Sequence, residues 1–174
     1  MINNKITLFL DYDGVLATVN QFNLTPQSKS WLFGTYFGGD GIYPFDKKCV
    51  KVLNEILSQF DCDIVVSSDW RLYNTIEQLQ KIFEDNGVKG KIVGVTPNYP
   101  TSMSWLEKNR AGEIMKYAKD NDIDKWLAID DLCLFNHFGT QEFAEDHFSM
   151  CNSEFEGIKQ SGLIDKIINK LNKL

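Results

Sequence analysis

The sequence predicts an α/β fold in which helices flank a central parallel β-sheet. Short apolar runs alternate with segments of helical periodicity along the chain, which is typical of consecutive βαβ units. The 174 residues include 43% hydrophobic and 24% charged residues, which indicates a globular chain long enough to bury a core.

Five strands are expected, and the first of them is expected at the centre of the sheet. Residues 6–10 read ITLFL, an unbroken apolar run that suits a strand covered on both faces. The other expected strands cover residues 63–66, 91–95, 125–129 and 147–151.

Four helices are expected to connect and close these strands, and they cover residues 47–60, 74–85, 104–119 and 159–172. The first places its apolar residues on one helical face, with Asp46 as the expected N-cap. The second is expected to stop at Asn86 and Gly87, a residue pair typical of helix ends.

The segment 17–45 fits neither a helical nor a strand period. Its aromatic residues and glycines suit either a small satellite core or a stacking platform for a substrate, with Trp31 and Phe37 as candidate stacking residues. Because no internal repeat or linker-like tract is present, we expect one domain over residues 1–174, with 17–45 as a flap or small loop cap.

Charge and cysteine usage exclude several classes of protein. The formal net charge of −6 argues against a general affinity for nucleic acid backbones. The four cysteines lack the paired spacing of a zinc site or a disulfide framework and indicate a reducing compartment. No apolar run approaches the roughly 18 residues of a membrane span. We therefore expect a cytoplasmic protein that does not bind membranes.

Acidic and hydroxyl residues follow directly after three of the expected strands. In chain order they are Asp11, Asp13, Ser67, Ser68, Asp130 and Asp131. Ligands bind at the carboxyl ends of strands in open α/β sheets, so we expect these residues to share one site, and Gly14 permits the turn that the first pair requires. Adjacent carboxylates at such a site favour Mg²⁺, and serine hydroxyls can hold phosphate oxygens. Lys108 or Arg110, at the start of the preceding helix, would supply a positive charge.

These motifs, in this order, resemble those of the haloacid dehalogenase (HAD) superfamily: hhhhDxDG, hhh[ST], a Lys or Arg, and hhhDD, where h is apolar. The stretches VVSSDWR, VGVTP, RxxEI and AIDD, which begin at residues 65, 93, 110 and 128, are more closely similar to the HAD domain of Swiss Army Knife RNA repair proteins. That domain is akin to the phosphatase half of phage polynucleotide kinase-phosphatase. The resemblance favours Arg110 over Lys108 and implies a Rossmann-like HAD fold. The intervals 14–46 and 87–104, where that superfamily carries cap domains, are too short for a separate one.

The resemblance also implies an activity, a Mg²⁺-dependent phosphomonoester hydrolase. Asp11 would be the nucleophile that forms an aspartyl-phosphate, and Asp13 the general acid and base. The Asp11 carboxylate, the Asp13 backbone carbonyl and Asp130 would hold Mg²⁺, with Asp131 orienting ligands or water from behind them.

The same resemblance implies which groups bind the substrate phosphate. Ser67, Ser68 and Arg110 are expected to bind its oxygens, with charge-assisted bonds from the arginine. Arg71 is left open between phosphate binding and an ion pair with a nearby acid such as Asp69.

Two further residues near the motifs are expected to be structural. Trp70 is expected to pack in the core rather than to stack on a substrate. Glu113, three residues after Arg110, is expected to hold that guanidinium in place.

The substrate is left open between a polynucleotide end, such as a 3′-phosphate, and small phosphoesters such as nucleotides or sugar phosphates. A non-enzymatic phospho-acceptor would carry its acid pair near the first strand and its acceptor after a later strand, the reverse of the order found here. An inactive binding module is disfavoured because every catalytic position holds a competent residue. Asp13 favours phosphoryl transfer over dehalogenation, because a leaving oxygen needs an acid.

Overall fold

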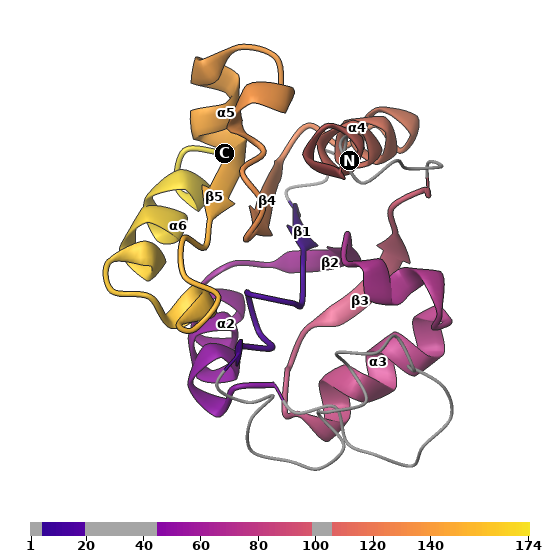
Figure 1. The fold of residues 1–174 in the computed structure, drawn as a ribbon, viewed down its shortest axis with the longest axis vertical. Helices are drawn as coiled ribbons and strands as arrows, with labels where there is room; N and C mark the ends of the chain where they lie inside the picture. The colour runs from indigo at the N-terminus through magenta and orange to yellow at the C-terminus, as the bar shows by residue number, and fades with distance from the viewer. Residues whose placement is uncertain (1–4, 20–44, 99–105) are drawn as a thin grey trace.

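A computed structural model describes residues 5–19, 45–98 and 106–174 of the chain (Figure 1). Five parallel strands form one sheet in the order β3-β2-β1-β4-β5, with β1 at its centre. The strands are β1 (Ile6–Leu10), β2 (Cys62–Val66), β3 (Lys91–Val95), β4 (Trp126–Asp130) and β5 (Phe148–Met150). The predicted central parallel sheet is confirmed, and so is the central position of the first strand.

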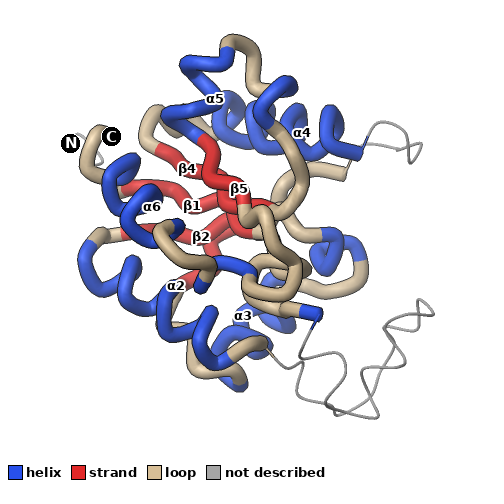
Figure 2. The backbone as a smooth tube through the Cα atoms, turned by 60° about the vertical axis from the view of Figure 1, so that its left-hand side comes forward, coloured by secondary structure: helices blue, strands red, loops and turns tan. Residues whose placement is uncertain are grey.

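Helices cover both faces of the sheet, which explains why β1 and β4 are buried along their whole length. Successive side chains of a strand point to opposite faces, so β1 buries Leu8 and Leu10 in one core cluster and Phe9 in another. The first cluster lies against α2 (Lys47–Gln59), α3 (Ile76–Asp85) and α6 (Leu163–Leu171), and the second against α4 (Leu106–Asp120) and α5 (Gln141–His147). Figure 2 shows α4 and α5 on one side of the sheet and α2 and α3 on the other.

Local signals set the start of α2 and the end of α3 where they were expected. The Asp46 side chain accepts a hydrogen bond from the Lys48 backbone N–H at 2.8 Å and so caps α2. Thr75 begins α3 with a reciprocal capping box, and α3 stops before Gly87, whose φ of +77° suits a residue without Cβ.

Several boundaries differ from the sequence prediction. The unpredicted helix α5 includes His147, so β5 starts only at Phe148. The helix expected from residue 159 begins at Leu163, because Gly162 adopts a left-handed φ of +75° after a 3-10 turn over Gly157–Lys159. Strand β4 extends one residue further than expected, so Asp130 is its last residue.

The flap expected over 17–45 lies almost entirely outside the described residues, as do Trp31 and Phe37. None of the helices in the described part of the chain has the length and apolar character needed to cross a lipid bilayer.

Candidate active site

The strand register brings the ends of β1, β2 and β4 to one edge of the sheet. Leu10 pairs with Val66 on one side and with Ile129 on the other. The pattern continues beyond the strands, because the Asp11 N–H donates to the Ile129 carbonyl at 3.0 Å and the Ser67 N–H donates to the Leu10 carbonyl at 3.1 Å. The predicted motifs therefore start side by side.

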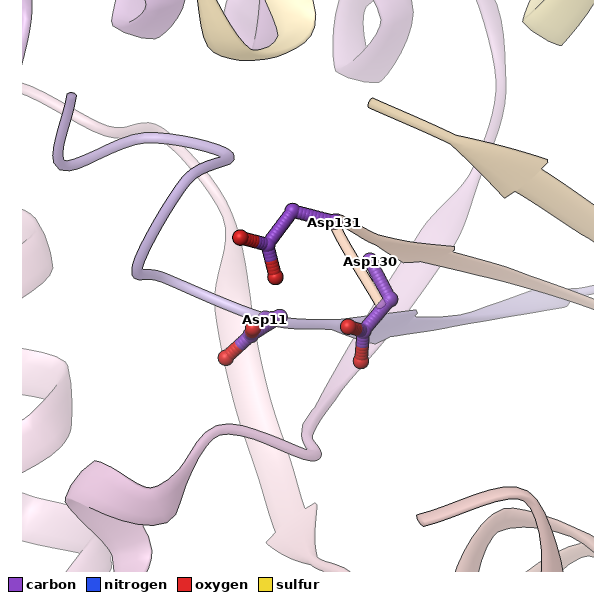
Figure 3. Close-up of side chains that lie close together, drawn as sticks. All are labelled: Asp11, Asp130 and Asp131. Carbon is purple, nitrogen blue, oxygen red and sulfur yellow. The ribbon is translucent and has the colours of Figure 1, made fainter. Parts of the chain in front are cut away.

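Three carboxylates converge at this edge. Oxygens of Asp11, Asp130 and Asp131 lie within 4.8 Å of one another, and Figure 3 shows the three side chains gathered where β1 and β4 end. Asp11 and Asp130 are buried. The sequence interpretation placed Asp131 behind a metal ion, whereas the structure brings its carboxylate into the cluster itself. Clustered carboxylate oxygens are the donors that a hard divalent cation such as Mg²⁺ prefers, so the residues present fit this ion.

The electrostatics of the cluster also suit a cation. Burial, followed by the charge of Asp11, raises the pKa of Asp131 to about 7. The same two causes raise the pKa of Asp130, against the opposing effect of Arg110. Crowded and buried carboxylates of this kind hold protons unless positive charge is supplied.

Arg110, near the start of α4, supplies part of that positive charge. Its Nη1 donates to Asp130 Oδ2 at 2.8 Å and lies 3.4 Å from Asp11 Oδ1. Its Nη2 donates to Asp69 Oδ1 at 3.0 Å. Burial by itself would lower the pKa of Arg110, but the charges of these three acids outweigh burial and raise it. One buried guanidinium therefore lies against the ends of β1 and β4.

Asp13 stands apart from the three clustered carboxylates. Its Oδ2 accepts a hydrogen bond from the Trp70 indole Nε1 at 3.0 Å, and its buried Oδ1 has no hydrogen-bond partner among the described residues. Burial, followed by the charge of Asp11, raises the pKa of Asp13 well above its usual range, although the bond from Trp70 acts in the opposite direction. The surroundings of Asp13 therefore favour the protonated form of its carboxyl group.

The turn that carries Asp13 depends on Gly14. The Ala17 N–H donates to the Tyr12 carbonyl at 2.8 Å, which closes the turn. Gly14 has a φ of +67°, and a Cβ added there would come 2.2 Å from Asp131 Oδ2. From the sequence, Gly14 was expected only to permit the turn. In the structure, its lack of a Cβ also leaves room for the Asp131 carboxylate.

The two serines after β2 have different surroundings. Ser67 Oγ is buried and has no hydrogen-bond partner among the described residues. Ser68 Oγ accepts from the Trp70 backbone N–H at 3.5 Å, as the cap of the 3-10 turn η2 (Asp69–Leu72). Ser67 is thus available to a substrate, while Ser68 supports the local turn.

Arg71 is occupied by the protein itself. Its buried guanidinium donates to the backbone carbonyl oxygens of Ser67, Ser68, Thr96 and Pro97. It also donates to Glu113 Oε2 at 2.5 Å, in an ion pair whose two side chains are each 3% exposed. Of the two roles left open for Arg71, these contacts favour the structural one. Glu113 is a closer partner than Asp69, whose Oδ1 lies 3.4 Å from Arg71 Nη1. Glu113 was expected to hold Arg110 and instead accepts this bond from Arg71.

A small polar pocket of about 40 Å³ opens beside Arg110. Its lining includes Asp69, Asn98 and Asn109, which offer a carboxylate and two amides. The pocket therefore suits a polar group next to the carboxylate cluster.

Comparison with known proteins gives one match. A family model described as "HAD domain in Swiss Army Knife RNA repair proteins" matches residues 7–160, a segment that contains all the site residues described above. No curated protein and no solved structure matches the chain.

Proposed function

The chain belongs to the family of HAD domains found in Swiss Army Knife RNA repair proteins, and we propose that it is a phosphomonoester hydrolase with Asp11 as its nucleophile. The observation that carries this proposal is the meeting of Asp11, Asp130 and Asp131 beside Arg110. With a divalent cation held by the carboxylates, this site could neutralise and orient a phosphate dianion while the Asp11 carboxylate attacks it.

In the first step, an Asp11 carboxylate oxygen attacks phosphorus and forms an aspartyl-phosphate. The bond between phosphorus and the leaving oxygen breaks, and its electron pair stays on that oxygen. The leaving oxygen takes a proton from Asp13, and the raised pKa of Asp13 favours the protonated form that this step needs. The products of this step are the free alcohol and the phosphorylated enzyme.

In the second step, a water oxygen attacks the phosphorus of the aspartyl-phosphate. Asp13, now a carboxylate, accepts a proton from this water. The bond from phosphorus to Asp11 breaks and returns its electron pair to the carboxylate. Inorganic phosphate leaves, and both aspartates regain their starting states.

Asp11, Asp130 and Asp131 would hold Mg²⁺, together with the backbone carbonyl of Asp13 that the family resemblance implies. When bound, the ion supplies positive charge that reduces repulsion between Asp11 and the phosphate. Ser67 and Arg110 would bind the transferring phosphoryl oxygens. The Ser67 hydroxyl supports this role, because it has no hydrogen-bond partner among the residues that the structure describes. Arg71 and Ser68 would hold the loop after β2 in shape rather than contact phosphate.

Gly14→Ala is expected to weaken Mg²⁺ binding and to lower activity about tenfold or more, because the new methyl group would displace the Asp131 carboxylate. The measurement is Mg²⁺ affinity by calorimetry, together with the Mg²⁺ dependence of turnover.

The matched control for this prediction is Gly87→Ala. Gly87 has a similar φ of +77°, but nothing lies within 4 Å of its added Cβ. Both variants therefore carry the backbone strain of a left-handed alanine, roughly 1–2 kcal/mol, and only Gly14→Ala carries the clash. Equal Mg²⁺ affinity in the two variants would show that Asp131 does not contribute to cation binding.

For the substrate, we propose the phosphorylated end of a polynucleotide. The description of the family as part of RNA repair proteins supports this proposal. We expect kcat/KM for an oligonucleotide 3′-phosphate to exceed that for a mononucleotide or a sugar phosphate. Each base that stacks on the protein would contribute roughly 1–3 kcal/mol.

Trp31→Ala or Phe37→Ala is expected to weaken the oligonucleotide reaction and to leave hydrolysis of a small aryl phosphate almost unchanged. The aryl phosphate serves as the control, because it has no base to stack. If small phosphoesters react as well as oligonucleotides, and the substitutions affect both alike, the protein is a general phosphatase for small phosphoesters instead.

A further inference from the structure

Three consecutive side chains of the 3-10 turn η2 reach three different parts of the site. Asp69 accepts from Arg110, Trp70 donates to Asp13, and Arg71 donates to carbonyl groups at the ends of β2 and β3. The contact from Trp70 differs from the other two, because it joins a core side chain to Asp13, the proposed general acid.

The Trp70 ring is held rigidly. It is 1% exposed and packs edge-to-face on Tyr12, with ring centroids 5.3 Å apart and an interplanar angle of 75°. Phe45 lies against it with a centroid separation of 6.0 Å. Tyr12 is the residue between Asp11 and Asp13, so the core packing that fixes the indole also fixes the backbone of both carboxylates. Close-packed side chains of this kind cannot swing away from one geometry without loss of contacts.

An indole N–H is a donor only, so it cannot accept a proton from a carboxyl group. The oxygen of Asp13 that faces Trp70 must therefore be an acceptor, which in a neutral carboxyl group is the carbonyl oxygen. That oxygen is Oδ2, at 3.0 Å from Nε1. Whenever Asp13 carries a proton, the proton must therefore sit on Oδ1, which has no hydrogen-bond partner within the described part of the chain.

We propose that Trp70 is the positioning residue of Asp13, which reserves Oδ2 as an acceptor and presents Oδ1 to the leaving oxygen of the substrate. This inference rests on the proposed phosphatase function. In the first step the proton passes from Oδ1 to the leaving oxygen, and in the second step Oδ1 takes a proton from the attacking water. The indole keeps its own proton throughout, so its bond to Oδ2 can persist through both steps.

The test uses Trp70→Phe, which keeps an aromatic ring in the core and removes the N–H. Its matched control is Trp126→Phe, the same change at a buried tryptophan on β4, at the opposite end of that strand from Asp130. The quantity to compare is kcat/KM, which reports the steps up to phosphoryl transfer, for an alkyl phosphate and for an aryl phosphate. Thermal unfolding of both variants accompanies the kinetics.

For Trp70→Phe we expect kcat/KM for the alkyl phosphate to fall on the order of 10- to 100-fold. This is the effect expected when one hydrogen bond to a group that becomes charged is lost. The aryl phosphate should change little, because its leaving oxygen needs little help from an acid. Trp126→Phe should change kcat/KM for the alkyl and the aryl phosphate by the same factor. In an Asp13→Ala background, Trp70→Phe should have no further effect on the alkyl phosphate.

A second readout does not depend on activity. The indole N–H resonance that disappears in Trp70→Phe belongs to Trp70, and Asp13→Ala should shift it because the acceptor is removed. An unshifted resonance would overturn the contact and the inference. Wild-type protein without phosphatase activity in Mg²⁺ would overturn the proposed function and, with it, this inference. The inference alone would be overturned by a different result. In that case the wild-type enzyme depends on Asp13, but Trp70→Phe loses activity equally on both substrates or loses none.

Discussion

Asp11→Asn is expected to lose all measurable phosphatase turnover and to keep the fold. An amide is not a nucleophile for phosphorus, so no aspartyl-phosphate can form. The local structure should survive, because the amide oxygen can still accept the bond from the Tyr12 N–H, which is 2.8 Å from Asp11 Oδ1. Initial rates on an aryl phosphate, together with circular dichroism and thermal unfolding, measure both parts of this expectation.

The control for this loss is Asp46→Asn, the same substitution at a buried aspartate outside the site. Asp46 caps α2 and pairs with Lys159 at 2.7 Å, and asparagine is an equally good N-cap. This variant should lose some stability and keep its activity. Near-wild-type turnover by Asp11→Asn would falsify the nucleophile assignment.

Removal of Mg²⁺ with EDTA is the second change expected to eliminate turnover. Without the ion, the carboxylates of Asp11, Asp130 and Asp131 repel the incoming phosphate. Addition of Mg²⁺ should restore the rate. Ca²⁺ should bind and support turnover poorly, because its larger and more flexible coordination shell would misplace Asp11.

Asp130→Asn should raise the Mg²⁺ concentration needed for activity or eliminate activity. Asparagine is a gentler change here than alanine, because Asp130 is fully buried and its two oxygens accept from Arg110 and from the Leu132 N–H, at 2.8 and 2.9 Å. Alanine would leave the Arg110 charge without its nearest partner at a cost of several kcal/mol. Full activity in metal-free buffer, or an unchanged Mg²⁺ requirement in Asp130→Asn, would contradict the metal assignment.

Most of the fold could be predicted because its signals are local. An unbroken apolar run such as residues 6–10 marks a strand buried on both faces, and Asp46 and Gly87 mark helix ends through their own backbone preferences. Helix α5 was missed because it has only seven residues, and among its residues only Ala144 is buried. So short a helix has little apolar periodicity to detect.

The part of the candidate site that lies at the ends of the parallel strands could be predicted from the sequence. Asp11, Ser67 and Asp130 meet because strands that run in one direction end at one edge. The contact of Trp70 with Asp13 and that of Arg71 with Glu113 could not be predicted, because they depend on how the turn after β2 faces its neighbours. No spacing in the sequence pairs Trp70 with Asp13, which lies 57 residues away.

The central claim, that Asp11 becomes phosphorylated during turnover, is tested most directly by chemical capture of the intermediate. Protein that has been mixed with an aryl phosphate and Mg²⁺ is quenched in acid and treated with borohydride, which reduces an aspartyl-phosphate to homoserine. Peptide mass spectrometry should find homoserine at position 11 in the wild type and none in Asp11→Asn. Continued phosphate release with unmodified aspartate at position 11, or homoserine at another position, would contradict the proposed mechanism.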